Sequence, residues 1–422
     1  TKTTIAWEYE NPVLHSVVGL MAAVTLLPSL FALTQIERTA RYVWPLMDQF
    51  LAIFLAVAWF QAFDEMVDHV MSDFSDRKGF NPGFFALGIN VCSLLALFAG
   101  ASLLLWRLRN HVWCFLVLTD CGAHLVSFAA IKMGADLQEH FFSYSPMGSS
   151  LCCLLVLVVA AALLRLKTTF IDCFFEEVDK ESGEIRVNEQ WEEASDDICW
   201  DATSMCLAVL LTQATHHVVC GEFDPLEDPR QQHTLRHVVL FSCYAAALAV
   251  FGGSLLLQME KVLSSAGWWI STLVHVACNV IVMMLAWAML LLLRWVILDS
   301  TLLAQCSELF AAVVLAIVVS GVSMLTIWLL PAAMRHFMHT IGKQQRMRRR
   351  KRVIRLIMQS MSLVCAWSWE QCFDKAMDAI ASEGWVRVGS KFIVALVLTA
   401  VQFPVYVTFL KPYTKHYEAQ DD

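Results

Sequence analysis

Residues 268–293 read WWISTLVHVACNVIVMMLAWAMLLLL and contain no charged side chain. A helix that crosses the hydrocarbon core of a bilayer, which is roughly 30 Å thick, needs about 20 mostly apolar residues. This stretch is longer than that and is not interrupted by a turn signal. It therefore predicts a helix that spans a membrane.

The composition of the whole chain agrees with this prediction. Of its 422 residues, 58% are hydrophobic and 16% are charged, and the mean hydropathy is +0.58. A soluble globular protein has about 45–50% apolar and about 25% charged residues, so the composition excludes a soluble enzyme, a disordered protein and a nucleic-acid binder. The 14 cysteines lie mostly inside apolar runs, where a free cysteine behaves as a small hydrophobe, and this excludes a disulfide-stapled secreted domain.

Similar apolar runs recur along the chain and predict about eleven transmembrane helices. They cover residues 13–34, 45–63, 83–106, 111–131, 149–166, 200–219, 236–257, 268–293, 305–330, 353–373 and 389–410. A membrane β-barrel would instead need short segments of alternating hydrophobicity. The predicted fold class is therefore an all-α, polytopic membrane protein.

The distribution of Lys and Arg predicts the orientation of these spans. The loops that follow the odd-numbered spans, together with the C-terminal tail, hold 19 basic residues, and the opposite side holds ten. Because cytoplasmic loops carry the excess of Lys and Arg, we expect the N-terminus outside and the C-terminus in the cytoplasm. The membrane would be the plasma membrane or an endomembrane.

Two loops of opposite charge are candidate partner sites. Residues 172–198 are strongly acidic and predict a solvated connector with a short helix, or else a docking segment for a protein partner. Residues 343–355 are strongly basic. Basic residues next to a span attract anionic cytoplasmic lipid, by about 1 kcal/mol each, so Arg346–Arg352 are expected to anchor the chain to the bilayer surface.

An internal repeat is the clearest pattern in the sequence. Residues 59–68 read WFQAFDEMVD and residues 369–378 read WEQCFDKAMD, so that Trp, Gln, Phe and both Asp coincide without a gap. Residues 211–217, LTQATHH, form a diverged third copy in which His216 stands in the place of Asp64, 152 positions earlier. The runs LFAGASLLL at 97–105 and VFGGSLLL at 250–257 are separated by the same offset.

The repeat predicts a four-helix unit that is used three times, with the third copy truncated. The corresponding units would be residues 1–134, 135–300 and 301–422, and the second to fifth spans should superpose on the sixth to ninth. Small residues let helices approach closely in membranes, so we expect Gly100, Gly252 and Gly253 to face another helix.

The repeated motif gathers polar groups on one helix face. Gln61, Asp64 and Asp68 lie at positions i, i+3 and i+7, which share a face. The same face in the other copies would carry Gln213, His216 and Cys220, and Gln371, Asp374 and Asp378, and His217 next to His216 is a further candidate. All three helices run in the same direction, so these groups would meet near the outer surface and could line a cation site. The alternative is that these residues only mark where the helices leave the bilayer.

Two further polar pairs lie near the middle of spans. Asp120 and His124 are spaced at i and i+4, and so are His275 and Asn279. Ionisable groups inside a membrane are costly and usually face a cavity or each other. These pairs therefore predict either a proton or ion path or a structural hydrogen bond between the two members of each pair.

An enzyme interpretation rests on histidine. Gln213, His216 and His217 fit a Q-x-x-H-H box, and His233 and His237 fit an H-x-x-x-H box; paired imidazoles of this kind can hold iron. A di-iron centre in a membrane desaturase needs about eight histidines and a third box, which the sequence does not show. The cofactor is unknown from the sequence, with His216 and His217 as candidate metal ligands, and we expect the chain not to be an enzyme.

The sequence thus supports three functional hypotheses. The first is a membrane transporter or channel for a cation or for protons, with its polar cluster at the ends of the second, sixth and tenth spans. The second is a scaffold or subunit that transports nothing. The third is the histidine-ligated metal enzyme.

Overall fold

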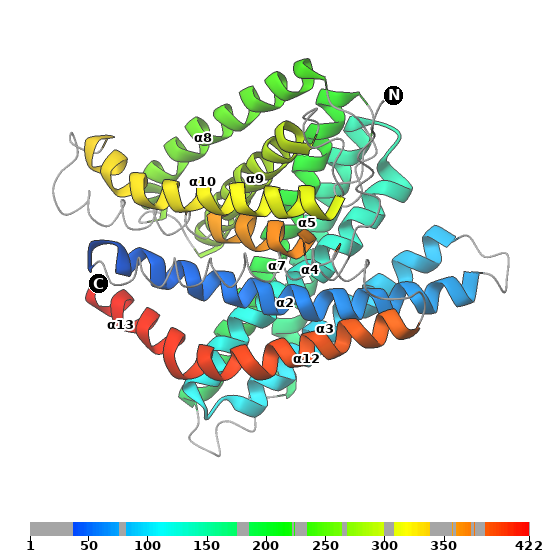
Figure 1. The fold of residues 1–422 in the computed structure, drawn as a ribbon. Coiled ribbons are helices and arrows are strands. Elements are labelled where there is room, and N and C mark those ends of the chain that lie inside the picture. Colours follow the sequence, from blue (N-terminus) through cyan, green and yellow to red (C-terminus); the bar gives the residue numbers. More distant parts are fainter. Residues whose placement is uncertain are drawn as a thin grey trace, which may run out of the picture.

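The computed structural model describes residues 37–75, 82–174, 185–221, 223, 234–263, 268–298, 308–337, 357, 360–372, 375 and 385–421. Every regular element among these residues is a helix (Figure 1). The prediction of an all-α protein of the polytopic membrane type is therefore confirmed.

The helices follow one another in chain order. Their bounds are α2 (Glu37–Ser75), α3 (Pro82–Leu108), α4 (Val112–Phe142), α5 (Pro146–Phe174), α7 (Ile185–Cys220), α8 (Leu235–Leu263), α9 (Trp268–Leu298), α10 (Glu308–Phe337), α12 (Trp385–Val405), the π-helix η1 (Tyr406–Leu410) and α13 (Lys411–Asp421). A further helical segment, called here the 360–372 helix, lies between α10 and α12.

The predicted spans coincide with these helices wherever the structure describes them. The span predicted at 13–34 and the basic loop at 343–355, with Arg346–Arg352, lie outside the described residues. Within the described ranges, seven helices are long and apolar enough to cross a membrane, namely α2, α3, α4, α7, α8, α9 and the continuous α12–η1–α13 helix. The count of eleven spans stays a prediction.

The helices form an inner and an outer group. In the most apolar 18-residue window, 72% of the residues of α7 are buried but only 11% of those of α3. Helices α2, α4 and α9 resemble α7 in this respect, whereas α8 and α12 resemble α3. Figure 1 shows α2 and α12 running side by side, and the two helices are in contact. The outer helices therefore present apolar faces of the kind that contact lipid.

The acidic segment 172–198 differs from its prediction. Its second half is not a solvated connector, because α7 begins at Ile185 and continues without interruption into the span. Ile198 is fully buried, and Trp191 is buried with its indole N–H donating to the backbone oxygen of Ser102 at 3.0 Å. Apolar residues at helical spacing thus hold a polar-looking stretch against α3 and α4, although its overall composition is acidic.

Two of the repeated glycines lie in different surroundings. A Cβ atom on Gly252 would lie 2.6 Å from Cγ2 of Ile281 on α9, so this glycine lets α8 and α9 approach closely as predicted. A Cβ atom on Gly100 would meet nothing within 4 Å, so the prediction that Gly100 faces another helix is wrong. The side-chain position of Gly253 lies outside the described residues.

Candidate functional site

A cluster of charged side chains is buried between α2, α4 and the C-terminal helix. The ammonium group of Lys411 donates to Oδ2 of Asp48 at 2.8 Å and also to Oδ2 of Asp120. The hydroxyl of Tyr406 donates to the backbone oxygen of Asp48 at 3.1 Å and lies 3.4 Å from Oδ2 of Asp120. We call these four residues the ion cluster. Asp48 and Lys411 are 363 positions apart in sequence, so the cluster joins the first and the last described helices.

A local irregularity in the C-terminal helix positions two members of the ion cluster. Pro404 lacks a backbone N–H, and the chain continues as one π-helical turn from Tyr406 to Leu410 before α13 begins at Lys411. A π-turn changes the direction in which the following side chains point, and such turns are frequent at functional sites. Tyr406 is fully buried and Lys411 is 4% exposed, because this turn directs both towards α2 and α4.

The ion cluster holds more negative than positive groups. The side chains of Lys411 and Asp48 are each 5% exposed and that of Asp120 is 24% exposed. Asp201 on α7 adds a further carboxyl group to this region, since Asp120 and Asp197 are its charged neighbours. Buried ions are costly unless they are paired, and here one ammonium group is shared by two carboxylates. The region can therefore attract a cation or exchange a proton.

His124 connects the ion cluster to the interior of the bundle. It lies one helical turn after Asp120 on α4, it is buried, and its Nε2 is 3.4 Å from Oε1 of Gln49 on α2. Its Nδ1 has no hydrogen-bond partner among the described residues. A buried imidazole with one nitrogen available can accept or release a proton.

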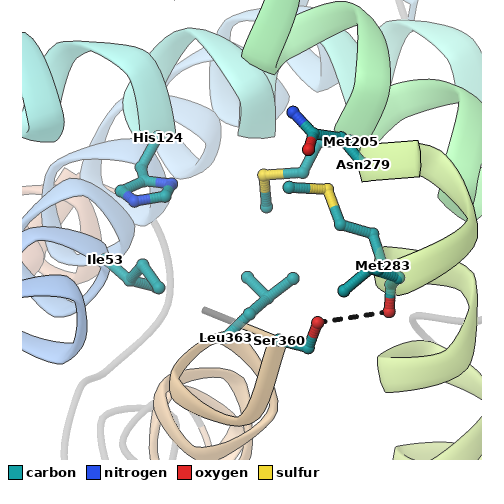
Figure 2. Close-up of a pocket in the computed structure, with 8 residues that line it drawn as sticks. Ile53, His124, Met205, Asn279, Met283, Ser360 and Leu363 are labelled. Carbon is teal, nitrogen blue, oxygen red and sulfur yellow. Dashed lines mark hydrogen bonds between the residues drawn. The ribbon is translucent and has the colours of Figure 1, made fainter. Parts of the chain in front are cut away.

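A small cavity lies beside His124 at the centre of the bundle. Its volume is about 10 Å³, which is close to the roughly 10–15 Å³ that one water molecule needs. Figure 2 shows His124 on one side of the cavity, with Met205, Met283 and Asn279 opposite. The residues that line it are Ile53, His124, Met205, Asn279, Val282, Met283, Ser360 and Leu363. The cavity is therefore mostly apolar, with His124, Asn279 and Ser360 as its polar lining.

The first and third copies of the repeated motif are in contact. The amide of Gln61 donates to Oε1 of Glu370, the residue that precedes Gln371. Asp64 forms an ion pair with Lys132 on α4, at 3.6 Å. Gln371 is half-buried at the end of the 360–372 helix. The structure thus brings Gln61 next to the third copy and pairs Asp64 within its own unit.

The second copy of the motif lies among other partners. His216 is buried, and its ring packs edge-on against Trp295 on α9, with the ring centroids 5.3 Å apart. His217 turns to α5, where its Nδ1 is 3.4 Å from Oγ of Ser149. Gln213 is 2% exposed. His216 and His217 therefore face different helices.

The other predicted site residues are more scattered. Asp68 is exposed, and Asn279 is buried beside the cavity. Asp374, Asp378 and the side chain of His275 lie outside the described residues. Of the two mid-span pairs, Asp120 and His124 thus belong to one polar region together with the ion cluster, and Asn279 faces the same cavity as His124.

The tryptophans of the repeated motif make hydrogen bonds to neighbouring helices. The indole of Trp369 is 5% exposed and donates to Oγ of Ser320 on α10 at 2.9 Å. That of Trp59 donates to Oγ1 of Thr399 on α12, also at 2.9 Å. Both therefore join helices within the bundle.

The enzyme interpretation gains nothing from the arrangement of the histidines. Within the described ranges, no three His, Cys, Asp or Glu side chains are grouped so that they could hold a metal ion together. His233 lies outside those ranges, and His237 is at the start of α8.

Comparison with known proteins adds no assignment. No protein-family model matches the sequence, and neither a curated protein nor a solved structure matches it.

Three residues of the site are missing from the sequence-based prediction. Lys411 was counted as part of a cytoplasmic tail, and Asp48 and Tyr406 were counted only as parts of spans. An Asp inside the apolar run 45–63 and a Lys between two prolines at the end of the last span were the available signals, because an ionisable residue within a membrane usually has a partner.

Proposed function

We propose that this protein moves protons or a small cation across its membrane. The observation that carries the proposal is the ion cluster. Two carboxylates, of Asp48 and Asp120, share the ammonium group of Lys411 between helices that can span a membrane. One helical turn after Asp120, His124 lines a cavity that is about the size of one water molecule. Ionisable groups at such depth are expensive, and they commonly mark ion pathways and proton relays.

The proposed path begins at the side that the charge bias predicts to be cytoplasmic. The ion cluster lies near the start of α2 and α4, and the cavity lies deeper in the bundle. Asp120 and Asp48 attract the cation or proton, Lys411 balances their charge when the site is empty, and His124 passes the proton on or orients the water in the cavity. The repeated motif, with Gln61 and Asp64, would form the opposite end of the path, on the side predicted to be outside.

The test measures flux by purified protein in lipid vesicles. A pH-sensitive dye inside the vesicles reports proton entry after a potassium diffusion potential is applied, and the same experiment is repeated with sodium and potassium gradients. Asp120→Asn should lower the flux at least roughly tenfold, because it removes a charge from the path and keeps the shape of the side chain. Glu139→Gln is the matched control, since Glu139 is an exposed residue of α4 that lies outside the proposed path. Equal flux in both variants would contradict the proposal.

A second candidate function is a scaffold that transports nothing. It is favoured by the outer ends of the helices, where Glu65 on α2 is 3.0 Å from both Arg387 and Lys391 of α12. Together with the pair of Asp64 and Lys132, these contacts give Asp64 and Glu65 basic partners within the chain. Wild-type vesicles that carry no flux above the protein-free level would favour this candidate.

The orientation and the partners remain part of the proposal. We expect the C-terminus in the cytoplasm, Arg346–Arg352 at anionic lipid, and the part of the acidic segment 172–198 that precedes α7 accessible to a protein partner. Protease cleavage of sealed vesicles at each loop measures the orientation directly.

A further inference from the structure

The inner helices close a ring around the central cavity. Helix α2 contacts α4, α4 contacts α7, and α7 contacts α9. The 360–372 helix completes the ring. Its Ser360 donates to the backbone oxygen of Val282 on α9 at 3.2 Å, drawn as the dashed line in Figure 2, and its Ser362 donates to that of Leu46 on α2 at 3.5 Å. Each of the five helices contributes at least one residue to the cavity lining.

Three of these lining residues occupy equivalent positions in the three copies of the sequence repeat. The offsets that align the motif copies are 152 positions from Asp64 to His216 and 310 positions from Asp64 to Asp374. Applied to Ile53, the same offsets give Met205 and Leu363. All three line the cavity, although none of them was used to find the repeat. Equivalent positions of three copies therefore meet at one point.

Three positions further along these helices, the three copies carry the same residue, alanine. Ala56, Ala208 and Ala366 are related by the same two offsets, and their exposed fractions are 2%, 0% and 0%. Small side chains at one level let three helices approach a common axis. The apolar middle of the ring thus has the same construction in each copy.

The helices around the axis pack in the same order in the first two units. In α2–α5, the first and second helices both contact the third, and the third contacts the fourth; α7–α10 repeat these contacts in the same order. Helices α3 and α8 are the second helices of the first two units, and both belong to the outer group. In the third unit, α12 follows the 360–372 helix and also belongs to the outer group.

Polar residues lie at both ends of this apolar middle. One turn before Ile53 and Met205, the equivalent positions carry Gln49, which contacts His124, and Asp201, which lies near Asp120. Two turns beyond the cavity level, Glu370 contacts Gln61. A short apolar constriction between polar ends can exclude water and ions until it widens.

We propose that a path runs along the axis of the five-helix ring and that Ile53, Met205 and Leu363 form its hydrophobic gate. This inference rests on the proposed transport function and adds the place where the path closes. In the structure the gate is shut, because the space at this level holds no more than about one water molecule. Opening requires the three equivalent helices to move apart.

The test compares membrane currents of gate variants in planar bilayers. Ile53→Ser, Met205→Ser and Leu363→Ser should each raise the proton or cation current at least roughly tenfold, since a polar side chain lets water enter the constriction. Ile53→Phe should lower it by filling the cavity. Leu291→Ser is the matched control, because Leu291 is buried on α9 but packs with Phe241 and Ala245 of α8, away from the cavity.

The possible results separate the two proposals. Serine variants that carry the same current as wild type, in protein that Asp120→Asn still inactivates, would overturn the gate and leave transport standing. The absence of current in wild type and in all variants would overturn both. Where a serine variant does not elute as a folded particle, Ile53→Ala takes its place, and a current unchanged by it would count against the gate in the same way.

Discussion

Removing the ammonium group of Lys411, the first residue of α13, should lower the free energy of unfolding strongly, because two buried carboxylates depend on it. Lys411→Met keeps the length of the side chain but leaves Asp48 and Asp120 without their shared cation. Asp48 is 4% exposed, so its carboxylate cannot regain water without a local opening of the bundle. Breaking a buried ion pair by removing one partner costs about 3–5 kcal/mol, and here two carboxylates lose their partner at once.

A triple variant tests whether the lost stability comes from the unpaired carboxylates. When all three charges are removed together, in Asp48→Asn, Asp120→Asn and Lys411→Met, no buried charge is left uncompensated. Replacing a whole buried ion group by neutral residues is often neutral or even stabilising, so the triple variant should regain most of the lost stability. Non-additivity of this kind is expected for residues in one network.

The assay is unfolding of the purified protein in mixed micelles with increasing dodecyl sulfate, followed by circular dichroism. Lys415→Met, one helical turn further along α13, is the matched control because Lys415 is exposed, and it should change the free energy of unfolding by no more than about 0.5 kcal/mol. A Lys411→Met variant within about 1 kcal/mol of wild type, or a triple variant less stable than the single one, would refute the reasoning.

Two further predictions concern packing between helices, and both are measured by thermal unfolding in detergent. Gly252→Leu should destabilise the protein by at least about 1–3 kcal/mol, the usual cost of overpacking, because a Cβ atom there would already lie 2.6 Å from Ile281; Gly100→Leu, which meets open space, should stay within about 0.5 kcal/mol of wild type. Trp369→Phe should cost about 1 kcal/mol through the lost hydrogen bond to Ser320, and a change below a few tenths would show that this bond contributes nothing.

The fold class could be predicted from the sequence because it depends on local composition. Long apolar runs must form helices in a membrane, since only a helix satisfies its backbone groups within the segment. The start of α7 could not be predicted in the same way. Its acidic residues dominate the composition, and only the contacts of Trp191 and Ile198 with neighbouring helices show that it belongs to the bundle.

The candidate site could be predicted only in part. Asp120, His124 and Asn279 stand out because polar residues in the middle of a span need a reason to be there. The partnership of Asp48 with Lys411 joins residues far apart in the chain and depends on the π-turn before α13, so no local pattern reveals it. The three copies of the repeated motif were expected to form one shared cluster. In the structure, Asp64 pairs with Lys132 and His216 packs against Trp295.

The central claim is that this chain carries protons or a small cation, and the reversal potential of the current through wild-type protein in a planar bilayer tests it most directly. Gradients of protons, sodium and potassium are imposed one at a time, with a protein-free bilayer as the reference. The account predicts a current whose reversal potential follows the gradient of one of these ions and which disappears in Asp120→Asn. A current no larger than that of the protein-free bilayer would contradict it.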